Sequence, residues 1–141
     1  MNKKICTLPN IDVKKLNNIV CSLVNLYKTC SPFKICKKMG INVLVIELPE
    51  AVDGFFVKSD DINNKNYISI LINTSVAKKE RKKICAHELG HAILHQNVNA
   101  ENCADSTFLE NLELEAEIFS SILLNKNFNK SHQKQLFYNS S

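Results

Sequence analysis

The stretch ICAHELGHAILH, residues 84–95, carries the most specific signal in this sequence. It contains the motif HExxH, in which His87 and His91 are four residues apart and Glu88 follows the first histidine. In a helix, such a spacing places both imidazoles on one face, about one turn apart, where they can bind one zinc ion. Glu88 lies near the same face of the helix and can act as general base on a water in the open coordination position of the zinc ion.

The neighbours of the motif indicate that this helix is buried. They are largely apolar and include Ile84, Ala86, Leu89, Ala92 and Leu94. A buried histidine that has neither a metal nor a hydrogen-bond partner is costly, so an apolar setting makes an accidental match of this short motif a poor explanation. We therefore predict a zinc site in which His87 and His91 are ligands.

A third histidine follows the motif, and its spacing argues against a role as ligand. His95 comes eight residues after His87, which corresponds to a rise of about 12 Å along an unbroken helix. That distance is too long for both side chains to bind one ion. We interpret His95 as a structural residue or as a hydrogen-bond partner of a ligand, with substrate contact as the alternative.

The third ligand is expected from an acidic segment further along the chain. Residues 98–125 contain six acidic residues and no Lys or Arg, and residues 107–124 have a helical pattern. Glu113 and Glu117 share a face at i, i+4, so one can bind the metal while the other accepts the remaining N–H of a zinc-bound histidine. Glu115 is the rival ligand, because a helical wheel places it nearer the apolar arc. The alternative for all three is a solvated surface.

The remaining pattern predicts an α+β fold. An amphipathic helix is expected at about 12–29, and Ser31 followed by Pro32 starts a short helix that Gly40 ends. Strands are expected at 41–48, 54–58 and 67–73, before the histidine helix and the glutamate helix. The sequence therefore predicts N-terminal helices, a small three-stranded sheet and two further helices.

Composition narrows the class of protein. The 141 residues suit one domain. The net charge of +4 comes from alternating basic and acidic blocks, and these do not form the continuous basic surface that direct nucleic-acid binding needs. No apolar run approaches the ~20 residues of a membrane span, and no leader is recognised, so we expect a cytoplasmic protein without a membrane partner. The six cysteines have no paired spacing and are expected to be reduced thiols.

Four further observations concern segments spread along the chain: SPFKICKKMGI at 31–41, GFFV at 54–57 with YISILIN at 67–73, AHELGHAILH at 86–95 and ELEAEIF at 113–119. In this order, they together resemble the ImmA/IrrE family of bacterial metallo-endopeptidases. The first is similar to the family's NPFxIAxxLGI and the second to its two strands. The third matches AHELGHxxLH, and the fourth resembles ExEANxF, with Glu117 in place of the usual Asn. The resemblance covers roughly residues 31–124.

The resemblance implies a single zincin-like zinc metallopeptidase domain over 1–141, with its core at 31–124 and a short tail at 126–141. It implies that Zn²⁺ is bound by His87, His91 and Glu113, with Glu88 as base. In peptidases of this build, the substrate adds as a strand beside the active-site helix, for which 54–58 and 67–73 are candidates. Tyr67, His95, His132 and Tyr138 are candidates for a second oxyanion donor.

The expected substrate is a helix-turn-helix repressor of a phage or mobile element, whose cleavage derepresses genes. Two other functions are weaker. One is a non-catalytic zincin-fold regulator that acts by binding a partner protein, with its basic N-terminal helices docking an acidic face. The other is DNA binding through residues 1–40, which lack a recognition-helix pattern.

Overall fold

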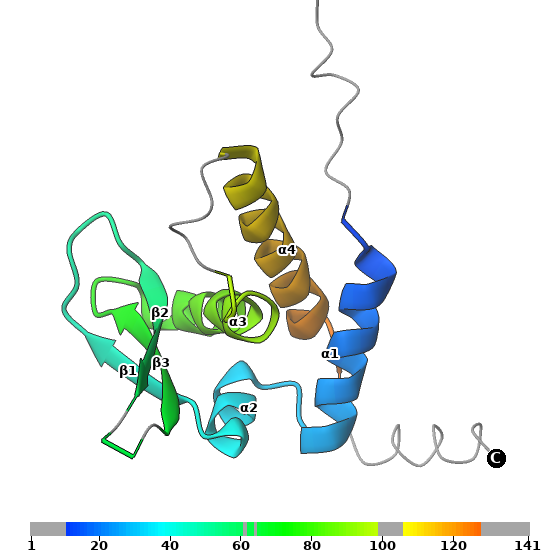
Figure 1. The fold of residues 1–141 in the computed structure, drawn as a ribbon, viewed down its shortest axis with the longest axis horizontal. Helices are drawn as coiled ribbons and strands as arrows, with labels where there is room; N and C mark the ends of the chain where they lie inside the picture. Colours follow the sequence, from blue (N-terminus) through cyan, green and yellow to red (C-terminus); the bar gives the residue numbers. More distant parts are fainter. Residues whose placement is uncertain (1–10, 61, 64, 99–105, 128–141) are drawn as a thin grey trace, which may run out of the picture.

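The computed structural model describes residues 11–60, 62–63, 65–98 and 106–127 (Figure 1). These residues form, in chain order, α1 (Val13–Tyr27), α2 (Pro32–Met39), β1 (Asn42–Ile46), β2 (Gly54–Asp60), β3 (Asn66–Asn73), α3 (Lys78–Leu94) and α4 (Ser106–Leu124). The predicted α+β class is confirmed. Apart from Lys126 and Asn127, the predicted tail at 126–141 lies outside the described residues.

The two N-terminal helices begin and end where local chemistry requires. The carboxylate of Asp12 accepts a hydrogen bond from the Lys15 N–H at 3.0 Å, and the Ser31 hydroxyl accepts one from the Lys34 N–H at 3.3 Å. Each contact satisfies a backbone donor that the first helical turn leaves free. Gly40 ends α2 with a φ of 78°, a left-handed conformation that glycine adopts without steric cost.

The sheet has the order β1-β3-β2, with β1 parallel to β3 and β2 antiparallel to it. In Figure 1 it lies on one side of α3, and α4 and α1 lie on the other. Residues 69–72 of β3 are paired on both sides, so the second of the two candidates for receiving a substrate strand, 67–73, is wrong. The strand at 54–58, here β2, is an edge of the sheet, and only an edge strand has backbone groups free to pair.

The core surrounds the histidine helix. Side chains from every helix and from the central strand are fully or almost fully buried in it, among them Leu16, Val20, Ile35, Ile70, Ile72, Leu89, Phe119 and Leu123. Of the thiols in the described part of the chain, Cys21, Cys30, Cys36 and Cys85 are free, as predicted. Cys6 and Cys103 lie outside that part. No described helix has both the length and the apolarity of a membrane span.

A glycine inside the motif allows α3 and α4 to pack closely. A Cβ placed on Gly90 would lie 3.0 Å from Cδ1 of Phe119 and 3.3 Å from the Cα of Ala116. Such distances are tighter than ordinary van der Waals contact, so the absence of a side chain at Gly90 lets the glutamate helix approach the histidines.

A second glycine, Gly54, lets β2 lie against α3, and its replacement tests this packing. A Cβ at Gly54 would lie 2.7 Å from Cγ2 of Ile84 and 2.8 Å from the carbonyl oxygen of Leu71. We expect Gly54→Ala to lower the free energy of unfolding by about 1–3 kcal/mol, the usual cost of overpacking. Urea denaturation measures this value, with Ser59→Ala on the exposed part of the same strand as control. Equal stability of the two variants would contradict the close contact.

Candidate metal centre

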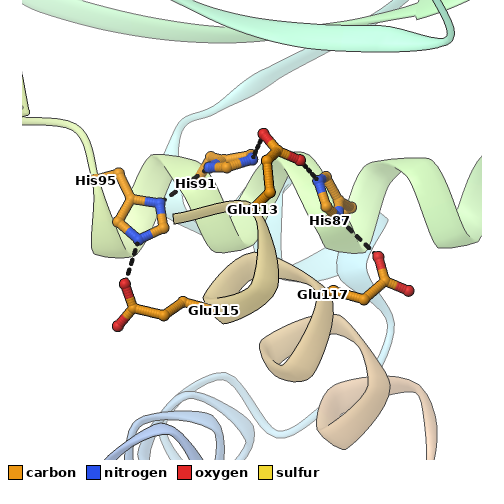
Figure 2. A network of polar contacts seen from close by, with 6 residues as sticks. All are labelled: His87, His91, His95, Glu113, Glu115 and Glu117. Carbon is orange, nitrogen blue, oxygen red and sulfur yellow. Dashed lines mark hydrogen bonds and ion pairs between the residues drawn. The ribbon is translucent and has the colours of Figure 1, made fainter. Parts of the chain in front are cut away.

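The two histidines of the motif lie side by side on α3. Their ring centroids are 4.9 Å apart, as the i, i+4 spacing predicts. The following turn of the helix adds His95, whose ring centroid is 5.1 Å from that of His91. Figure 2 shows the three rings in a row along α3, with glutamates reaching them from α4.

Glu113 lies between the two histidines of the motif. Its Oε2 is 3.0 Å from Nε2 of His87, and its Oε1 is 2.9 Å from Nε2 of His91 (Figure 2). One potential ligand atom from each of the three residues lies within 4.8 Å of the other two. Within the described residues, this is the group of side chains that can hold a metal ion.

The other two glutamates contact the outer sides of the histidines. Oε2 of Glu117 is 3.2 Å from Nδ1 of His87. Oε1 of Glu115 is 3.2 Å from Nε2 of His95, whose Nδ1 is 2.9 Å from Nδ1 of His91. The sequence places all three glutamates on one helix, but their separate partners come from the way α4 crosses α3.

Glu113 and Glu115, the two candidates for the third ligand, differ in burial and in the histidines that they contact. The Glu115 side chain is 32% exposed and the Glu113 side chain 65% exposed, so the helical wheel ranks their burial correctly. Burial, however, does not bring Glu115 to the HExxH pair, because its carboxylate contacts His95 instead. Glu113 is the glutamate that the structure brings to both His87 and His91.

The donor chemistry of this cluster suits a cation. A neutral imidazole has one N–H and one lone pair. If the Nδ1–H of His87 donates to Glu117, its Nε2 presents a lone pair to the Glu113 carboxylate, which also only accepts. Two acceptors at 3.0 Å repel each other unless a proton or a cation lies between them. Two imidazoles with one carboxylate are also a ligand set of catalytic zinc sites that keep an open position.

Burial shifts the pKa of two groups at the centre. It raises the pKa of Glu88 to about 7, against the opposing effect of His87 and with a further rise from Glu113. Burial also lowers the pKa of His91, although Glu113 acts in the opposite direction. A cation between the ligands would favour the charged form of Glu88 and so oppose the rise of its pKa.

A cleft of about 350 Å³ opens beside the cluster. Glu88 and Glu113 line its polar part, and its apolar wall includes Phe55 and Phe56 of β2 together with Val98, Leu109 and Leu112. The ring of Phe56 is stacked on that of His91, with centroids 6.3 Å apart. The cleft therefore joins the histidine cluster to the edge strand of the sheet.

The candidates for a second oxyanion donor are only partly described. Tyr67 stands near the start of β3 and is not among the residues that line the cleft, whereas His95 lines it. His132 and Tyr138 lie outside the described residues.

Comparison with known families matches residues 36–138 to Peptidase_M78, described as the IrrE N-terminal-like domain. The chain belongs to the Peptidase_M78 family. This confirms the resemblance to ImmA/IrrE proteins. The match also extends past residue 124, where the resemblance in the sequence motifs ends.

A curated relative is consistent with membership of Peptidase_M78. The chain is 35% identical over 104 residues to "Uncharacterized immunity region protein 2" of Bacillus phage phi105. The alignment covers 72% of this chain and 63% of the phage protein, so the chain spans less than two thirds of that relative. No solved structure matches the chain significantly.

Proposed function

We propose that this chain is a zinc-dependent endopeptidase, in which His87, His91 and Glu113 bind the zinc ion and Glu88 is the general base. The proposal rests chiefly on the Glu113 carboxylate, which lies 3.0 and 2.9 Å from the Nε2 atoms of the two HExxH histidines. Membership of a peptidase family supports the same function.

The chain's own residues supply the proton transfers of the reaction. Zinc, when bound, supplies a Lewis acid for the scissile carbonyl and the attacking water. Glu88 lines the cleft beside the ligands, where it takes a proton from the attacking water and passes it to the leaving amine. Glu117 contacts Nδ1 of His87, and this contact would hold Nε2 of His87 facing Glu113, available to bind the metal.

The substrate is proposed to bind as an extended strand along β2. This strand is an edge of the sheet and contributes Gly54, Phe55 and Phe56 to the cleft. Backbone pairing supplies affinity for an extended peptide, and pockets for alternate side chains supply specificity. The apolar wall of the cleft favours an apolar residue near the scissile bond.

The proposed substrate is a helix-turn-helix repressor, cleaved to derepress phage or mobile-element genes. Two findings support it: the ImmA/IrrE resemblance, and a relative that is named as an immunity region protein of a phage. The chain would then act as an anti-repressor whose partner is a protein, with no direct contact to DNA.

Incubation with the repressor encoded beside this gene tests the function. We expect new fragments by mass spectrometry when zinc is present and loss of cleavage after EDTA treatment, with recovery on adding zinc back. Cleavage that EDTA leaves unchanged would contradict a metal-dependent reaction. A stable complex without cleavage would instead favour the non-catalytic regulator.

A further inference from the structure

We infer that His95 and Glu115 are positioning residues, which together fix the tautomer and the orientation of His91. This inference rests on the proposed function, because it assigns His91 as a metal ligand. Its basis is a line of contacts in which Nδ1 of His91 lies 2.9 Å from Nδ1 of His95, and Nε2 of His95 lies 3.2 Å from Oε1 of Glu115 (Figure 2).

The direction of the hydrogen bonds follows from the carboxylate. An ionised Glu115 only accepts, so Nε2 of His95 must donate to it. In a neutral His95 ring, Nδ1 then carries a lone pair and must accept. Nδ1 of His91 therefore donates to His95, which leaves the lone pair of His91 on Nε2. That nitrogen is the one that lies 2.9 Å from Oε1 of Glu113.

The surroundings of His95 hold its ring in place. The residue is 7% exposed, and its backbone N–H donates to the His91 carbonyl oxygen at 2.8 Å, at the end of α3. Both ring nitrogens already have partners within the protein. Although His95 lines the cleft, no ring nitrogen is left to bind substrate, so the positioning role is favoured over the substrate contact that the sequence left open.

The same logic relates the two histidines of the motif. Glu117 contacts Nδ1 of His87 directly at 3.2 Å, whereas Glu115 reaches Nδ1 of His91 through His95. Each of the two histidine ligands is therefore oriented by one glutamate of α4, and Glu113 lies between the two histidines. This arrangement gives a separate role to each of the three glutamates at 113, 115 and 117.

Zinc affinity of the full-length protein tests the inference by competition with a chelating dye. We expect Glu115→Ala and His95→Ala to weaken zinc binding about 10–100-fold, the usual effect of removing a group that orients a ligand. Glu110→Ala, which removes an exposed carboxylate from the same helix, is the matched control and should leave the affinity unchanged. His95→Asn retains an acceptor near the position of Nδ1 and should recover most of the affinity.

The hydrogen positions are measured directly by ¹⁵N NMR of the histidine rings. We expect a proton on Nε2 of His95 and none on its Nδ1, with a proton on Nδ1 of His91. A proton on Nδ1 of His95, or a Glu115→Ala affinity equal to that of Glu110→Ala, would overturn the inference. Failure of the wild-type protein to bind zinc would count against the proposed function, whereas in the zinc-bound protein the NMR signals decide the positioning role.

The affinities are interpretable only in folded variants, which thermal unfolding verifies. His95 is buried, and its replacement by Ala can unfold the chain. Glu115 is partly exposed, and its truncation leaves the apolar core intact. Glu115→Ala therefore decides the inference even if His95→Ala does not fold.

Discussion

Replacing Glu88 by Gln is expected to lower kcat/KM for repressor cleavage by about 10²–10⁴-fold, the range that a general base contributes. Glutamine has nearly the same size and shape as glutamate but cannot accept the proton of the attacking water. Glu88 is 8% exposed and lines the cleft beside the proposed ligands. Single-turnover cleavage with saturating zinc, followed by gel or mass spectrometry, measures the rate.

Zinc binding separates a catalytic effect from a structural one. Glu88→Gln leaves His87, His91 and Glu113 in place, so its zinc affinity should stay within a few-fold of the wild-type value. Glu110→Gln removes an exposed negative charge from α4, so it is the control for a general loss of negative charge and should cleave normally. Equal cleavage by the wild type and Glu88→Gln would refute the proposed role of Glu88 and indicate another base.

Replacing Glu113 by Ala is expected to weaken zinc binding more than 100-fold, beyond the 10–100-fold effect of a residue that only orients a ligand. The variant loses one of three ligands and the only negative charge among them. The Glu113 side chain is 65% exposed, so its truncation removes no buried packing and the variant should remain folded. Chelator competition measures the affinity, and circular dichroism confirms the fold.

The relative loss of zinc affinity distinguishes a ligand from a positioning residue and from an unrelated glutamate of the same helix. We expect Glu113→Ala to have the largest effect, Glu115→Ala a smaller one and Glu110→Ala none. If Glu115→Ala instead removed zinc while Glu113→Ala retained it, Glu115 would be the ligand, as its greater burial suggested, and the proposed ligand set would be wrong. Cleavage by Glu113→Ala at low zinc should fall in parallel with metal occupancy.

Much of the fold was accessible from the sequence because its signals are local. Ser31, Pro32 and Gly40 mark the start and end of α2, and each acts through its own backbone or its nearest neighbours. The HExxH spacing acts over one helical turn, so the pairing of His87 with His91 needs no tertiary information. Such features were predicted correctly because the residues that interact are close in the chain.

Local sequence signals could not predict which histidine each glutamate contacts. Glu113, Glu115 and Glu117 differ by only two positions from one to the next, and the periodicity of one helix does not state which side chain meets which histidine. That depends on where α4 crosses α3, which Gly90 permits by its close contact with Phe119. The contact of Glu115 with His95 joins residues 20 positions apart, and no pattern in the sequence indicated it.

The sequence by itself therefore determined the α+β class, the histidine pair with the glutamate that we propose as base, and the helix that we propose to supply the third ligand. Only the tertiary structure decided that β2 is the edge strand beside the cleft and that, of the glutamates at 113, 115 and 117, Glu113 is the one that contacts both HExxH histidines. The physical reason is that helix and strand periodicities act within one element. Strand order and the crossing of two helices depend instead on packing between residues that are distant in the chain.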